Sequence, residues 1–101
     1  MIDLKELQKQ IIENKVNKGF NTTDVNFEFL LTYGELTEAY EAYRRKHDNV
    51  GEEIADVLIY LLSICNILNV DLEKELINKM EINKNRVYKK VNGVDIKVDD
   101  K

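Results

Sequence analysis

The sequence contains no proline and no tryptophan, and only four glycines, one cysteine and one histidine. Because proline and glycine are the residues that most strongly interrupt helices, long helices are permitted nearly everywhere. The single cysteine, Cys65, excludes an intrachain disulfide, which fits a reducing compartment, and we expect a cytoplasmic location. The longest apolar run, Val57–Leu62, is far too short to span a bilayer, so we expect no membrane partner. The only histidine, His47, leaves no Glu-x-x-His pair for a di-iron site.

Positive charge is also scarce, since 15 lysine and arginine residues face 19 acidic ones and the net charge is −4. Binding to nucleic acid depends on a basic surface that releases counterions, so we expect no DNA or RNA partner. A small phosphate-bearing molecule is still allowed if a metal ion screens the repulsion. With 44% hydrophobic and 34% charged residues in 101 positions, the composition is that of one globular domain.

Apolar residues at helical spacing, together with capping residues, predict four helices. We expect them at residues 3–18, about 25–46, about 52–68 and 71–88. The fourth helix should bury one side, formed by Leu72, Leu76, Ile77 and Met80. The third helix is apolar nearly all round, and four short helices can hardly enclose it within one chain. We therefore expect a homodimer or a homotetramer.

The sequence changes character after the fourth helix. Asn92-Gly93 between valines is typical of a two-residue hairpin with a type I′ turn. Pairing outward from this turn sets Lys90 opposite Asp95, and Tyr88 opposite Lys97. The predicted fold is all-α, a four-helix bundle (residues 1–88) with a short β-hairpin and tail (residues 89–101).

Two acidic motifs carry the functional signal: Glu35-x-x-Glu38, and then Glu53-x-x-Asp56. Spacing of three residues places two carboxylates side by side on one helix face, with Cβ atoms roughly 5–6 Å apart. Two such pairs on facing helices would bring four carboxylates together. All-oxygen ligation of this kind suits Mg²⁺, or Mn²⁺ in its place.

The helical wheel separates these acids from ordinary surface residues, which is what most helical acids are. Glu35 and Glu53 fall inside apolar stripes, whereas Glu41 and Glu52 fall outside them. A carboxylate packed against apolar surface is costly unless a positive charge compensates it. No lysine or arginine lies at matching spacing along these stripes, so a bound metal is the favoured interpretation.

With these residues in place, the chain resembles the MazG-like nucleoside triphosphate pyrophosphohydrolases of the all-α NTP pyrophosphatase superfamily. The resemblance covers roughly Phe27 to Tyr88 and rests on both acidic motifs, on residues 52–61 and on the late segment Lys79–Arg86. It implies hydrolysis of a nucleoside triphosphate to the monophosphate and pyrophosphate, with Mg²⁺ as cofactor.

The resemblance also implies roles for single residues, which we state as expectations. Metal ligands would be Glu35, Glu38, Glu53 and Asp56, and Glu38 would also orient or deprotonate the attacking water. Substrate contacts would come from three residues of the late segment: Lys79 and Arg86 on phosphates, and Asn83 on the nucleotide.

Some alternatives stay open at this point. Family members often carry two adjacent glutamates where this chain has Gly34-Glu35, and a shifted register would use Thr32 and Glu35 as the first ligand pair. Phe20 and Tyr60 could stack on a base, but we expect core packing as the use of each. Rival functions are a non-catalytic helical module that binds a nucleotide or protein, and a phosphoribosyl-ATP pyrophosphohydrolase.

Overall fold

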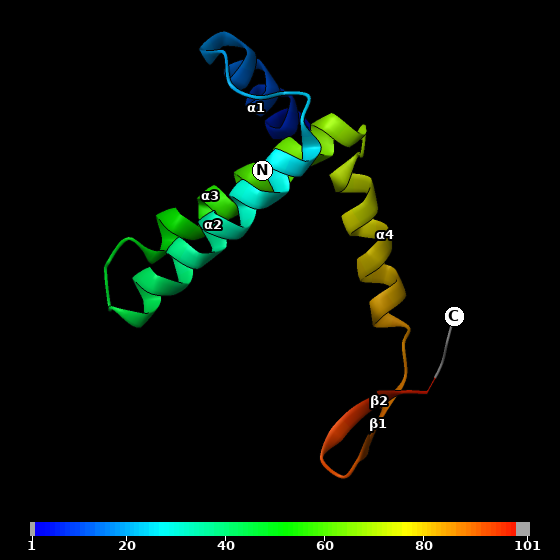
Figure 1. Ribbon diagram of the computed structural model, residues 1–101. Helices are drawn as coiled ribbons and strands as arrows, with labels where there is room; N and C mark the ends of the chain where they lie inside the picture. Colours follow the sequence, from blue (N-terminus) through cyan, green and yellow to red (C-terminus); the bar gives the residue numbers. More distant parts are fainter. Residues whose placement is uncertain (1, 99–101) are drawn as a thin grey trace.

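The fold, taken from a computed structural model that describes residues 2–98, consists of four helices and one hairpin (Figure 1). The elements are α1 (Leu4–Lys18), α2 (Val25–Arg44), α3 (Val50–Leu68), α4 (Leu72–Lys84), β1 (Tyr88–Val91) and β2 (Val94–Lys97). The predicted four helices and hairpin are thus confirmed, although α3 begins two residues early and α4 ends before Arg86. Residues 99–101 of the predicted tail lie outside the described residues.

Side chains at the helix ends account for these boundaries. Asp3, Asp24 and Asp71 each accept a hydrogen bond from the backbone N–H three residues on, at 3.0, 3.1 and 3.2 Å. Gly19 and Asn69 end α1 and α3 in the left-handed conformation, with φ of 70° and 56°. These residues therefore cap the helices at the ends that the sequence predicts.

The hairpin has the predicted register. Lys90 pairs with Asp95 and Tyr88 with Lys97 in an antiparallel ladder. Asn92 and Gly93 have φ of 52° and 79°, the two positive values that a type I′ turn requires.

The centre of the molecule is an antiparallel pair formed by α2 and α3 (Figure 1). Ala39 and Ala42 of α2 are buried, as are Leu62 and Ile64 of α3. Small side chains on α2 allow the two helix axes to approach closely. Helix α1 then packs against α3, with the amide of Asn66 donating to the Gln8 carbonyl at 2.9 Å.

The four helices do not close into a bundle within one chain, which corrects the sequence-based prediction. Helix α4 bends away from α3 by 107° and contacts the start of α1, where Lys5 and Asp71 form an ion pair at 3.6 Å (Figure 1). Leu76, Ile77 and Met80 are therefore 47–62% exposed instead of buried. An apolar pattern shows that a face needs covering, but not that the cover lies in the same chain. Among the described residues no single helix is long and apolar enough to cross a membrane, and only α3 and α4, taken together as a bent pair, meet that length and composition.

Candidate metal centre and active site

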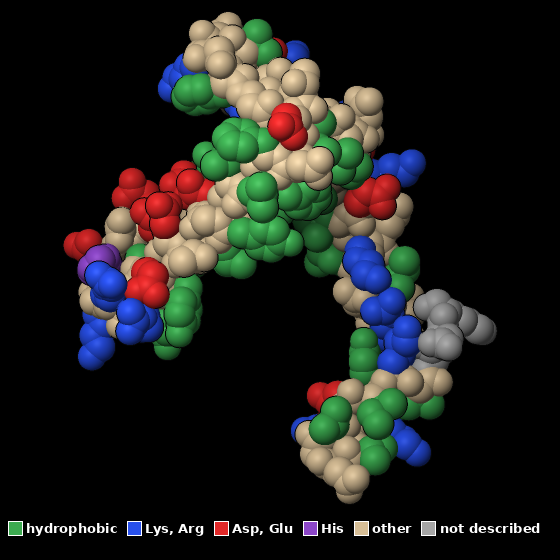
Figure 2. Space-filling view, viewed as in Figure 1, with side chains coloured by type: hydrophobic (Ala, Val, Ile, Leu, Met, Phe, Trp, Pro, Cys, Tyr) green, Lys and Arg blue, Asp and Glu red, His purple; other side chains and the backbone are tan. Residues whose placement is uncertain are grey.

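Three carboxylates from two helices meet on one side of the α2–α3 pair. Glu35, Glu38 and Glu53 each place one oxygen within 4.8 Å of the others. Helical spacing aligns the first two on α2, and antiparallel packing brings the first turn of α3 alongside. Figure 2 shows acidic side chains gathered there. We call these three residues the carboxylate cluster.

Asp56, the fourth predicted ligand, falls outside this group of three but lies close enough for its charge to act on Glu35. Glu35 and Glu53 are half-buried, whereas Glu38 and Asp56 are exposed. Glu52 is exposed and outside the cluster, as the helical wheel predicts. The arrangement has two inner carboxylates that packing holds in place and two outer ones that solvent can reach.

The cluster concentrates negative charge without a protein cation to balance it. Burial raises the pKa of Glu35, and hydrogen bonding to Glu38, repulsion from Glu38 and the charges of Asp56 and Glu53 raise it further. Within residues 2–98, no salt bridge involves any of these four acids. A divalent cation would relieve the repulsion, and the donor set of carboxylate oxygens fits Mg²⁺ or Mn²⁺.

Asn49, which the sequence reasoning missed, supports Glu53 from the loop before α3. Its amide nitrogen donates to Glu53 Oε1 at 3.3 Å, while its own Oδ1 is buried and has no hydrogen-bond partner within residues 2–98. A buried acceptor without a donor is costly and calls for a partner such as a metal-bound water. The signal that could have pointed to Asn49 is its position at the N-cap of α3. Its side chain makes no capping hydrogen bond there and is used on Glu53 instead.

The alternative register through Thr32 has weaker geometry. The hydroxyl of Thr32 donates to the Glu28 carbonyl of the same helix at 2.7 Å. Glu35 and Glu38, in contrast, both bring an oxygen to the cluster. The structure therefore favours the Glu35 and Glu38 pair, whose role as metal ligands stays a prediction.

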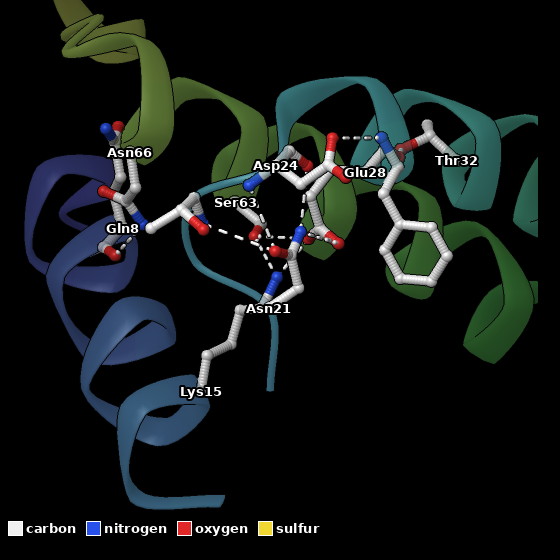
Figure 3. Close-up of polar contacts among 10 residues, drawn as sticks. Gln8, Lys15, Asn21, Asp24, Glu28, Thr32, Ser63 and Asn66 are labelled. Atoms are coloured by element: carbon white, nitrogen blue, oxygen red, sulfur yellow. Dashed lines mark hydrogen bonds and ion pairs between the residues drawn. The ribbon is translucent and has the colours of Figure 1, made fainter. Parts of the chain in front are cut away.

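A second charged network, absent from the sequence-based prediction, lies about two turns before Glu35 on the same face of α2. Glu28, seven residues before Glu35, is 1% exposed and forms a buried ion pair with Lys15 of α1 (Figure 3). Ser63 of α3 donates to Glu28 Oε1 at 2.9 Å, and Asn21 donates to Oε2 at 3.3 Å. Burial alone would raise the pKa of Glu28, but the hydrogen bonds from Lys15, Ser63 and Asn21 outweigh it and lower that pKa. The network joins α1, α2 and α3 and satisfies its own charge.

A largely apolar groove of about 670 Å³ opens beside this network, between α1, α2 and α3. Phe20, Phe27 and Tyr60 line it, and Lys15 and Glu28 reach it. Phe20 is 57% exposed, so it is not a core residue. Burial raises the pKa of Tyr60, and the charges of Glu35, Glu28, Asp56 and Glu38 raise it further, so this groove residue is close enough to the carboxylates to feel their charge.

The predicted substrate-binding residues of the late segment do not join this site within one chain. Lys79 and Asn83 are exposed on α4, and Arg86 follows its end. Helix α4 leads away from the α2–α3 pair and carries a column of basic side chains (Figure 2). Arg86 is half-buried, and its Nε has no hydrogen-bond partner among the described residues.

Comparison with known proteins shows which family has a domain over the region that contains these carboxylates. No curated protein and no solved structure matches the chain significantly. A family model does match: the MazG nucleotide pyrophosphohydrolase domain, over residues 27–88. That range covers more than half of the chain and contains the whole carboxylate cluster, Asp56 and the late segment. The chain therefore belongs to the family of the MazG nucleotide pyrophosphohydrolase domain.

Proposed function

We propose that this protein hydrolyses nucleoside triphosphates, deoxy or ribo, to the monophosphate and pyrophosphate in a Mg²⁺-dependent reaction. The observation that carries the proposal is the carboxylate cluster, whose oxygens from Glu35, Glu38 and Glu53 approach within 4.8 Å without a protein cation among the described residues. Membership of a nucleotide pyrophosphohydrolase family supports the same chemistry.

In this proposal Glu35, Glu38, Glu53 and Asp56 hold Mg²⁺, with Mn²⁺ as a possible substitute. The bound ion supplies charge neutralisation and orientation for the triphosphate oxygens. Asn49 keeps the Glu53 carboxylate in position through its hydrogen bond at 3.3 Å. Burial raises the pKa of Glu35, and hydrogen bonding to Glu38 and repulsion from the neighbouring carboxylates raise it further; a bound cation would remove that repulsion.

Glu38 is proposed to act on the attacking water. It is exposed, so water reaches its carboxylate, and it stands beside the half-buried Glu35. The water oxygen forms a bond to the α-phosphorus while Glu38 accepts its proton, and the bond from that phosphorus to the α–β bridging oxygen breaks. The products are the nucleoside monophosphate and pyrophosphate.

The groove beside Tyr60 is proposed to receive the nucleoside. Its volume of about 670 Å³ lies in the range of small-molecule sites, and its walls include the aromatic rings of Phe20 and Phe27. A nucleoside there would be adjacent to the carboxylates, because Tyr60 borders both regions. Base stacking is therefore preferred to core packing for Phe20 and Tyr60.

Three finer expectations belong to the proposal. Lys79, Asn83 and Arg86 are expected to bind phosphates and nucleotide after α4 meets the site of another copy, or after it moves. We expect a cytoplasmic homodimer or homotetramer. Neither nucleic acid nor membrane is expected as a partner, given the net charge of −4 and a longest apolar run, Val57–Leu62, that is too short to span a bilayer.

The test is release of pyrophosphate from a panel of nucleoside triphosphates with and without Mg²⁺. Glu53→Gln should lower turnover at least about 100-fold, because it removes a ligand charge from the metal centre. Glu52→Gln is the matched control, since Glu52 is the neighbour of Glu53 in the sequence but its carboxylate is exposed and outside the cluster. Turnover that Glu53→Gln leaves unchanged would refute the assignment, and nucleotide binding without turnover would support the non-catalytic module. Turnover of phosphoribosyl-ATP alone would support that narrower enzyme.

A further inference from the structure

Three polar side chains are buried in the wall of the largely apolar groove between α1, α2 and α3. They are Lys15, Glu28 and Ser63, with 9%, 1% and 2% of their surface exposed. Gln10 and Asn14 also line the groove but are exposed, so water competes with any ligand for their amide groups. Hydrogen bonds are strongest, and unpaired groups most costly, where water is excluded. The buried side chains therefore contribute most to the choice of ligand.

A count of donors and acceptors shows what this buried network has left over. The Glu28 carboxylate accepts hydrogen bonds from Lys15 and Ser63 on Oε1 and from Asn21 on Oε2. Lys15 donates to Glu28 and, at 2.6 Å, to the Ser63 hydroxyl (Figure 3). A lysine ammonium has three N–H donors, so one of them has no acceptor within residues 2–98. The groove wall therefore holds a cation with one unused hydrogen-bond donor.

An unused ammonium N–H selects for a ligand atom that accepts a hydrogen bond and carries negative partial charge. A carbonyl oxygen meets both requirements, whereas an amino group would direct its own N–H groups at the cation. Among nucleobases, uracil, thymine, cytosine, guanine and hypoxanthine carry a ring carbonyl. Adenine carries none and has an amino group where guanine and hypoxanthine have their carbonyl oxygen. Because a charged donor makes a hydrogen bond about twice as strong as a neutral one, this difference should be large.

We propose that Lys15 binds a carbonyl oxygen of the nucleobase, so that the groove prefers oxo-bases to adenine. Lys15 is then a specificity-determining residue, and Glu28 and Ser63 are positioning residues that hold its ammonium group in place. The buried network thus has a second role besides joining the three helices. This inference rests on the proposed function, because it takes the groove as the nucleoside site.

The first test compares three purine deoxynucleoside triphosphates that differ only at C6 and in the proton on N1. Their bases are hypoxanthine with a carbonyl, adenine with an amino group, and unsubstituted purine with a hydrogen atom. In the presence of Mg²⁺, kcat/KM of the wild-type protein should be about 10–100-fold higher for the hypoxanthine nucleotide than for the other two. That ratio is the expected effect of one hydrogen bond to a charged group.

The double variant Lys15→Met, Glu28→Leu removes the donor without stranding a buried charge. Its preference for hypoxanthine over adenine should fall below about 3-fold, because no cation is left to bind the carbonyl oxygen. A merely structural role would lower kcat/KM for every base alike and leave the ratio unchanged. Lys9→Met is the matched control, since Lys9 is exposed on the same helix and should keep the wild-type ratio. Circular dichroism should show that both variants keep their helices.

Binding of the α,β-imido analogues of the same nucleotides, measured by calorimetry with Mg²⁺, does not depend on turnover. A preference for the hypoxanthine analogue without turnover of any nucleotide would support this inference and refute the proposed hydrolase activity. Turnover with equal affinity for all three bases would overturn this inference and leave the activity standing. A folded double variant that keeps the preference, or Lys9→Met that loses it, would also overturn the inference. If the double variant does not fold, the wild-type comparison decides alone, and failure of all three analogues to bind would refute both proposals.

Discussion

Replacement of Lys15 by methionine tests the buried network most directly. Lys15 is a side chain only 11% exposed that donates to Glu28 and, at 2.6 Å, to Ser63. The variant keeps the aliphatic stem but leaves the Glu28 carboxylate, 1% exposed, with hydrogen bonds from Ser63 and Asn21 alone. Removal of one partner from a buried ion pair typically destabilises a protein by about 3–5 kcal/mol.

Protonation sets an upper limit on the penalty from the stranded charge. Glu28 can escape it by binding a proton, which at pH 7 costs about 3.7 kcal/mol for a carboxyl with an ordinary pKa near 4.3. We therefore expect Lys15→Met to lower the free energy of unfolding by about 3 kcal/mol at pH 7, towards the lower end of the range, because two donors remain. At pH 5 the same escape costs only about 1 kcal/mol, so the difference from wild type should shrink.

In the wild-type protein, the contribution of Glu28 to stability changes with pH in the opposite direction to that in the variant. There the folded state lowers the pKa of Glu28, so the carboxylate contributes stability above its unfolded pKa of about 4.3. That contribution should disappear as the pH falls below this value and through the lower pKa of the folded state. The variant should thus approach wild type between pH 7 and pH 5, before the wild type itself loses stability.

Urea denaturation followed by circular dichroism at fixed protein concentration measures these differences. The double variant Lys15→Met, Glu28→Leu removes both charges and should recover most of the lost stability. Lys9→Met, on the exposed side of the same helix, should change stability by less than about 0.5 kcal/mol. The reasoning is refuted if Lys15→Met costs less than about 1 kcal/mol at pH 7, or if the double variant is as unstable as the single one.

Three further predictions concern α2 and the candidate metal centre. Gly34→Ala should raise the free energy of unfolding by up to about 1 kcal/mol, because an added Cβ would meet nothing within 4 Å beyond its own stretch of helix in the part of the chain that the structure describes; no gain in urea denaturation would point to a contact outside the single chain. Asn49→Ala should weaken Mn²⁺ binding about 10-fold in a titration followed by electron paramagnetic resonance, with unchanged affinity arguing against support of Glu53. Mn²⁺ affinity should also fall as the pH drops through the raised pKa of Glu35, since the ligand must be deprotonated; an affinity flat from pH 7 to pH 4 would exclude Glu35 as a ligand.

Local signals in the sequence predicted most of the secondary structure. The caps at Asp3 and Asp71 and the Asn92-Gly93 turn depend on a few neighbouring residues, so their identity was sufficient. The packing of α4 was different. An apolar stripe at Leu76 and Met80 shows the need for a covering surface, but nothing local indicates whether that surface lies in the same chain.

The same contrast holds for the candidate site. Glu35, Glu38 and Glu53 could be selected because spacing and the apolar stripe are properties of single helices. Glu28 lies on the same stripe of α2 as Glu35, seven residues before it, so extending the stripe towards the start of the helix would have identified it. The cation that pairs with Glu28 could not have been identified from the sequence, because Lys15 belongs to a different helix and only tertiary packing brings it to Glu28.

The two acidic regions of α2 show how the fold can hold a repulsive cluster. At Glu28 the charge is fully compensated, and the network fastens α1, α2 and α3 to one another. Beyond the cluster, the buried Ala39 and Ala42 let α3 approach closely, which fixes the distance between the carboxylates of the two helices. The cluster therefore lies between two stabilising regions, which hold its mutually repelling carboxylates together. A site supported in this way can keep its carboxylates together before a cation arrives, so less free energy is needed to organise the ligands on binding.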